Sequence, residues 1–94
     1  MDIHREEIDK IRARSNAARS GPWLSIVEGR DQTSGSSFIM IGEGNHRDED
    51  LYLTGDDRSV PVADYDFIAN ARQDIPFLLA EIDRLQDLLR SKSN

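Results

Sequence analysis

The side chains that could bind or transform a ligand in this chain are few and widely spaced. Its two histidines are His4, near the N-terminus, and His46, in an acidic segment. Neither has a partner at the spacing that a metal site or a nucleophilic triad requires. Paired carboxylates such as Asp56 and Asp57 can serve as acid and base, but adjacent acids are typical of solvated turns. We therefore expect no enzyme activity, no metal site and no cofactor.

The best candidate for ligand chemistry is a site for an anion or a nucleotide. The single tryptophan either anchors the core or serves as a stacking platform for a base, and the arginines could pair with phosphate. Residues 28–37 include two Gly, three Ser and a Thr, whose backbone N–H groups could face an anion. This segment lacks the glycine spacing and the lysine of a P-loop, so an exposed flexible turn is the alternative. The candidate ligand-site residues are Trp23, Arg30, Ser34, Ser36 and Arg72.

Two clusters of charged residues can be interpreted as solvated surface without any ligand. Residues 42–50 concentrate acid, but they lack the alternating ligand spacing and the closing Glu of a calcium loop. All charges between residues 10 and 19 are positive, which suits a solvated helix face whose cations lie near the negative end of the helix dipole. An anion site on this helix is the alternative.

Three regions of different composition must position these residues. Residues 2–19 predict a charged helix with a thin apolar stripe, which Asp2 can cap and the Gly-Pro pair at 21–22 ends. Residues 23–54 contain three short runs rich in β-branched and aromatic residues, separated by polar, glycine-containing connections. We expect these runs, at 23–27, 37–41 and 51–53, to form a three-stranded antiparallel meander.

Residues 63–91 predict a C-terminal helix with an apolar stripe. The stripe repeats every three or four residues, with a period of about 3.5, which is typical of a two-stranded coiled coil. Pro76 removes a helical hydrogen bond, so we expect a kink or a break near Asp74–Pro76. Leu79 and Leu88 widen the stripe, which suits a four-helix bundle equally well. The stripe consists of Ile68, Ala71, Ile75, Leu78, Ile82, Leu85 and Leu89.

The small size of the chain favours association into an oligomer. A single domain of 94 residues buries only about 60–65% of its unfolded surface, and without Cys no disulfide can supplement its core. We therefore expect a homo-oligomer, either a dimer or a tetramer; the alternative is that the stripe forms the core of one domain. The predicted oligomer interface is Ile75, Leu78, Leu79, Ile82, Leu85 and Leu89.

The overall charge argues against two classes of partner. Twelve basic and 18 acidic residues give a net charge of −6, which opposes binding to DNA and to anionic lipid. No apolar run approaches the roughly 20 residues of a membrane span, and the N-terminus lacks the features of a signal peptide. The absence of Cys fits a reducing compartment. We expect a cytoplasmic protein with no DNA partner and no membrane partner.

Two segments of the chain resemble the small phage and prophage accessory proteins of the Ead-like family. One is the Ser-Gly-Pro-Trp turn at residues 20–23, which follows the N-terminal helix. The other is residues 63–81, which include the run Phe-Ile-Ala-Asn-Ala-Arg-Gln-Asp-Ile-Pro. The resemblance does not cover residues 24–62. It implies an accessory product of a phage or mobile element that acts in the host cytoplasm, and it brings no catalytic residues.

Two functions fit these expectations for a single small α+β domain. The first is a non-catalytic oligomeric interaction module that binds a host or defence factor and modulates or inhibits it. The alternative is a sequestering protein for a nucleotide-derived immune signal, which would use the candidate ligand site.

Overall fold

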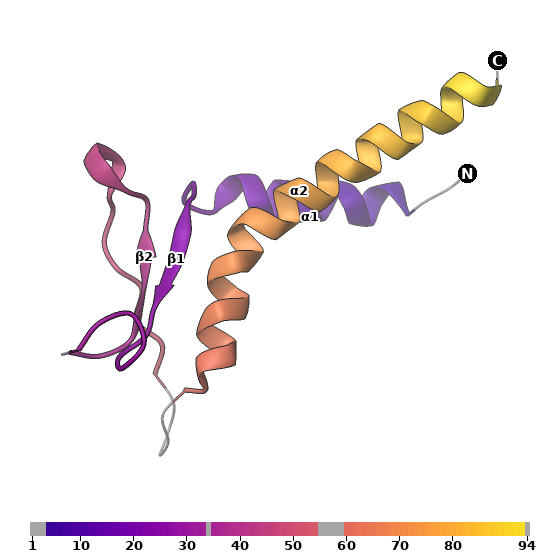
Figure 1. Cartoon of the computed structure of the whole chain (residues 1–94). Helices are drawn as coiled ribbons and strands as arrows, with labels where there is room; N and C mark the ends of the chain where they lie inside the picture. Colours follow the sequence, from indigo (N-terminus) through magenta and orange to yellow (C-terminus); the bar gives the residue numbers. More distant parts are fainter. Residues whose placement is uncertain (1–3, 34, 55–59, 94) are drawn as a thin grey trace. The chain divides into compact units, whose positions relative to one another are not determined.

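The computed structural model of the chain describes residues 4–33, 35–54 and 60–93 (Figure 1). The elements are α1 (Arg5–Ala17), β1 (Trp23–Ile26), β2 (Phe38–Ile41), the short 3-10 helix η1 (Gly44–His46) and α2 (Val62–Ser93). The chain is therefore α+β, with an N-terminal helix and a long C-terminal helix. It divides into two compact units. The sheet unit is Arg19–Gln73, and the helical unit combines the described residues up to Ala18 with those from Asp74 onward.

The sheet unit encloses a small apolar core. β1 and β2 pair antiparallel, with Trp23 opposite Ile41 and Ser25 opposite Ile39. Because side chains alternate between the faces of a strand, Ile39 and Ile41 point to the same side, and both are fully buried. The first turns of α2 lie beside β1 in Figure 1. The core cluster comprises Ile39, Ile41, Tyr65 and Ala69, with Trp23, Leu51, Leu53, Val60 and Ile68 packed against it.

The predicted three-stranded meander is wrong, because the sheet in the described residues has two strands. The third run meets β2 at one bridge, where Ile39 and Leu51 exchange backbone hydrogen bonds of 2.8 and 2.9 Å. That register would place Glu49 opposite Ile41, but the N–H of Asp48 donates to Ile41 instead, at 2.9 Å. The N–H of Glu49 donates to the Asp48 carboxylate, at 2.7 Å. This slip of one residue in the acidic run stops the ladder after a single bridge.

α1 spans fewer residues than the predicted helix. It begins at Arg5, with His4 at the N-cap position and no side-chain cap bond; the predicted cap, Asp2, lies outside the described residues. It ends at Ala17, before the Gly-Pro pair. The reason is that Arg19 already belongs to the sheet unit, where its side chain donates to the Glu49 carbonyl at 3.0 Å.

α2 is continuous through Pro76, so the predicted break is wrong. Proline inside a helix costs about 3 kcal/mol, and packing on both sides of it offsets that cost. Before the proline, Ala69 is buried in the core of the sheet unit; after it, Leu79 is buried in the helical unit. The alternative expectation, a kink at this position, stays a prediction.

The helical unit has one narrow stripe of mostly half-buried residues on each helix, which we call the buried stripe. On α1 the half-buried residues are Ile8, Ile11, Arg12 and Ser15, which recur at the helical spacing of three or four. On α2 the corresponding stripe consists of Ile75, Leu79, Ile82 and Gln86, of which Leu79 is buried. Arg12 Nη2 donates to Asp83 Oδ1 at 3.0 Å. Since Arg12 lies on the buried stripe of α1, this ion pair indicates that the two stripes face each other.

Candidate functional site

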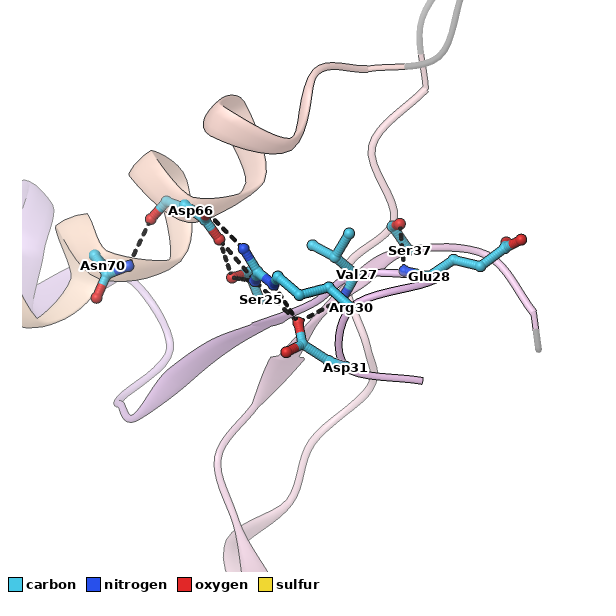
Figure 2. A network of polar contacts seen from close by, with 8 residues as sticks. All are labelled: Ser25, Val27, Glu28, Arg30, Asp31, Ser37, Asp66 and Asn70. Carbon is cyan, nitrogen blue, oxygen red and sulfur yellow. Dashed lines mark hydrogen bonds and ion pairs between the residues drawn. The ribbon is translucent and has the colours of Figure 1, made fainter. Parts of the chain in front are cut away.

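The densest polar cluster in the sheet unit centres on Arg30 and Asp66 (Figure 2). Arg30 Nη1 donates to Asp66 Oδ2 at 2.9 Å, and Arg30 Nη2 donates to Asp66 Oδ1 at 3.0 Å. Such a two-pronged contact is the strongest form of an arginine–carboxylate pair. The Ser25 hydroxyl donates to Asp66 and accepts from Arg30 Nη2 at 3.2 Å. The network therefore connects β1, the loop that follows it and α2.

The loop after β1 is shaped to hold Arg30 in place. The Val27 carbonyl accepts from the N–H groups of Arg30 and Asp31, at 3.1 and 2.8 Å, which forms a tight turn. The Asp31 carboxylate closes the turn by accepting from the Val27 N–H at 2.9 Å. The same oxygen, Oδ2, accepts from Arg30 Nε at 3.0 Å. Asp31 thus fixes its own turn and the arginine beside it.

Hydrogen bonds within this network favour the charged forms of its members. Hydrogen bonds from Arg30, and secondarily from Ser25, lower the pKa of Asp66 from 3.8 to about 2. Hydrogen bonds from Arg30, followed by that from the Val27 N–H, also lower the pKa of Asp31. The two carboxylates in turn raise the pKa of Arg30, with Asp66 the larger contributor. Groups with these pKa values do not exchange protons near neutral pH, so the arrangement suits a structural latch better than acid–base chemistry.

The structure does not gather the candidate ligand-site residues into one place. All three nitrogens of the Arg30 side chain donate to Asp66, Asp31 or Ser25. Trp23 begins β1 and Arg30 follows its other end, so the strand separates them. Ser34 lies outside the described residues, and the Ser36 carbonyl accepts from Gln32 Nε2 at 2.7 Å. Arg72 lies nearer to Trp23, because its side chain packs beside Gly21 and its Nη1 donates to the Arg19 carbonyl at 3.1 Å.

Trp23 serves as a core anchor, and a glutamine that sequence reasoning missed holds it. Trp23 is half-buried and packs against the core cluster of the sheet unit. Gln73 Oε1 accepts from the Trp23 N–H at 2.8 Å, and Gln73 Nε2 donates to the Trp23 carbonyl at 3.2 Å. The side-chain amide thus pairs with β1 as a peptide group of a neighbouring strand would. No periodic pattern marks this residue, because its partner is 50 positions away.

The six residues of the predicted oligomer interface divide into two sets. Ile75, Leu79 and Ile82 belong to the buried stripe of the helical unit, and Leu79 is only 5% exposed. Leu78 is 53% exposed, and Leu85 and Leu89 are each 48% exposed. Two further large side chains are exposed on the same half of α2, Phe77 at 65% and Leu88 at 42%. We call the set Phe77, Leu78, Leu85, Leu88 and Leu89 the exposed apolar face of α2.

Comparisons with known proteins provide no relative from which a function could be transferred. No family model, no curated protein and no solved structure matches the chain. Among the described residues, no group of three or more His, Cys, Asp or Glu side chains is placed to hold a metal ion. None of the described helices has both the length and the apolar character needed to cross a bilayer. Two features of the molecule therefore bear on function: the Arg30–Asp66 network and the exposed apolar face of α2.

Proposed function

We propose that this chain is a non-catalytic oligomeric interaction module that binds a host or defence factor and modulates its activity. The observation that carries the oligomeric part of the proposal is the exposed apolar face of α2, where five large apolar side chains lie along one half of a single helix. Clustered apolar side chains of this size on a surface mark protein interaction sites. Burying what remains exposed of each, roughly half of the side chain, would contribute about 1 kcal/mol.

The polar network supports a non-catalytic role. Arg30, Asp31 and Asp66 satisfy one another, and their perturbed pKa values follow from these internal contacts. This engagement of Arg30 also weakens the case for sequestration of a nucleotide, since that role needs the arginine for phosphate. The interaction module is the better supported of the two functions.

The proposed setting is the host cytoplasm during phage or prophage activity. The support is the resemblance of residues 20–23 and 63–81 to the Ead-like accessory proteins. A small accessory protein without catalytic groups would act by occupying a surface of its target. The net charge of −6 favours a target other than nucleic acid.

Native mass spectrometry of the protein purified from its own host tests the oligomeric part of the proposal. A dimer or tetramer with no additional mass is the expected result. An oligomer that carries a small molecule at each site would favour sequestration instead. A monomer at all concentrations would contradict the proposal.

The modulating part needs a functional readout. We would compare the factors captured by the tagged wild type, by Leu78→Glu on the exposed apolar face and by Ala80→Glu. Ala80 is exposed on a different side of the same helix, so its variant is the matched control for the added charge. We expect one factor to be captured by the wild type and by Ala80→Glu but not by Leu78→Glu, and its purified activity to change when the wild type is added. Unchanged activity of every captured factor would contradict the proposal.

A further inference from the structure

We propose that the exposed apolar face of α2 binds the same face of a second copy of this chain, with the two helices antiparallel. This inference rests on the proposed function, because it names the partner and the orientation of the oligomer. It goes beyond the coiled-coil pattern of the sequence, because that pattern includes Ile75 and Ile82, which are half-buried on the stripe that faces α1. The pattern also does not distinguish parallel from antiparallel pairing.

The residues available to a partner follow a coiled-coil spacing of their own. On one side of α2, a row of residues that begins with Asp74 recurs at alternating intervals of four and three positions. At about 100° per residue, this row lies roughly 100° around the helix from the stripe that faces α1. Five of its six members are exposed, and Glu81 is half-buried. We call this row the outer seam: Asp74, Leu78, Glu81, Leu85, Leu88 and Lys92.

The charges of the outer seam are distributed unevenly along the helix. Its acids, Asp74 and Glu81, lie in the first half of the row, and its base, Lys92, ends it. Parallel pairing in register would place each of these charges beside its own copy, which costs energy. Antiparallel pairing centred near residue 83 places Asp74 opposite Lys92 of the second copy at both ends. The charges of the seam are therefore complementary in one orientation and repulsive in the other.

The same antiparallel register pairs two of the three seam leucines with each other. It places Leu78 opposite Leu88 of the second copy and Leu85 opposite Glu81 of the second copy. Each pair is symmetric about residue 83, as a two-fold axis requires. Two leucine layers therefore flank the centre, and an ion pair closes each end.

The central acid does not enter this interface as an isolated charge. Glu81 already accepts two hydrogen bonds from Arg84 of its own chain, at 2.8 and 2.9 Å. In the antiparallel pair, the Glu81–Arg84 groups of both copies meet near the axis, with two negative and two positive charges. Desolvating such a balanced set is less costly than desolvating an unpaired carboxylate.

The end charges are available for contacts between copies. Within the described part of the helical unit, the ion pairs of α2 are Arg12–Asp83, Glu81–Arg84 and Asp87–Arg90. None of them uses Asp74 or Lys92, and both of these residues are exposed. An ion pair across the interface would therefore break no existing one.

Cysteine crosslinking of the full chain tests the orientation directly, because the natural sequence contains no Cys. Residues 74 and 92 are about 27 Å apart along the helix, so a crosslink between them must join two copies. We expect the double variant Asp74→Cys/Lys92→Cys to form covalent dimers under mild oxidation. We expect Asp74→Cys alone, Lys92→Cys alone and the control Ala80→Cys to stay uncrosslinked.

Each of the remaining crosslinking results would contradict either the antiparallel pairing alone or the proposed function as well. Crosslinking of Asp74→Cys to itself would show parallel pairing, which overturns this inference but leaves the oligomeric module standing. An oligomer in which none of the variants crosslinks would show that another surface is used, with the same consequence. A wild-type chain that is monomeric at all concentrations would overturn both this inference and the proposed function.

Charge reversal provides a second test that does not depend on oxidation. Asp74→Lys alone or Lys92→Asp alone would place like charges together at both ends of the interface. We expect each to raise the dimer Kd about tenfold at low salt, since an exposed pair occurs twice per dimer. The two changes combined should restore the wild-type Kd. Failure of the combined variant to recover would overturn the predicted pairing of Asp74 with Lys92.

Discussion

The two units differ in the size of their apolar cores, although both leave large apolar side chains in solvent. These are Leu24, Tyr52, Val62 and Phe67 in the sheet unit and the exposed apolar face of α2 in the helical unit. In the sheet unit, Ile39 and Ile41 are fully buried beneath α2 and Tyr65 is nearly so. In the helical unit, α1 has no buried residue, and Leu79 is the buried residue on the described part of α2 there. Two helices in contact can each cover one stripe, and α2 carries a second stripe that α1 does not reach. The difference indicates that the sheet unit has a core of its own, whereas the helical unit has little core without a partner.

The two units also differ in the sequence separation of their ion pairs. The Arg30–Asp66 contact joins residues 36 positions apart and fixes the loop after β1 on α2. Several ion pairs of the helical unit are local, such as Glu81–Arg84 and Asp87–Arg90, each three residues apart. Local pairs on a helix surface contribute only about 0.3–0.5 kcal/mol and do not constrain tertiary structure. In the described part of the helical unit, Arg12–Asp83 is the long-range ion pair, whereas Arg30 alone makes several side-chain contacts that fix the loop in the sheet unit.

The largest expected effect is the loss of the core of the sheet unit. Truncating Ile39, which is fully buried, should lower the free energy of unfolding by about 2–5 kcal/mol, because it removes apolar contacts and leaves a cavity. Trp23 is the single tryptophan and lies in this unit, so its fluorescence during urea unfolding reports the change. Leu85→Ala, on the exposed apolar face, should shift this transition by less than about 0.5 kcal/mol in dilute protein. Equal shifts for Ile39→Ala and Leu85→Ala would remove the distinction between the units.

A smaller effect is expected at the glutamine that pairs with β1. Gln73→Ala should cost about 1–3 kcal/mol, because the half-buried Trp23 backbone N–H and carbonyl lose their partner. The same urea titration measures this cost. Gln86→Ala is the matched control, since Gln86 is also half-buried on α2 but lies in the helical unit. If Gln86→Ala shifted the tryptophan signal as much as Gln73→Ala, the proposed role of Gln73 as a strand substitute would be wrong.

The smallest effect is a pH dependence of the polar network. The pKa of Asp66 is lowered from 3.8 to about 2, so its contribution to stability is present above about pH 4 and is lost as the pH falls through 2. The difference in melting temperature between the wild type and Asp66→Asn should therefore stay constant from about pH 5 to 8 and shrink toward pH 2. Glu43→Gln, at an exposed acid of the same unit, serves as the control for a general change in charge. A difference that persists unchanged at pH 2 would contradict the assignment.

The helices could be predicted from the sequence because their apolar spacing is local information. The long stripe that includes Ile75 and Ile82 marked α2 correctly as a helix. Periodicity could not show which part of this wide stripe faces α1, since Leu78 and Leu79 are neighbours in sequence yet lie on different sides. Only the position of α1 separates the buried residues from the exposed ones.

The rest of the fold depends on contacts between distant residues. The composition of residues 51–53 suits a strand, but a register slip at Asp48 limits the pairing to one bridge. Arg30 could be recognised as a candidate for anion binding, but its partner in the structure is a carboxylate 36 positions away. Propensity and spacing contain no information on either pairing.

The central claim is that the exposed apolar face of α2 holds copies of the chain together, and sedimentation equilibrium tests it most directly. We would compare the wild type, Leu85→Glu and the control Ala80→Glu over a wide concentration range, with helix content checked by circular dichroism. The account predicts that the wild type and Ala80→Glu associate, while Leu85→Glu keeps its helix content and has a Kd raised by about a hundredfold or more, because two leucines per dimer are lost from the interface. A monomeric wild type, or equal association of all three proteins, would contradict the claim.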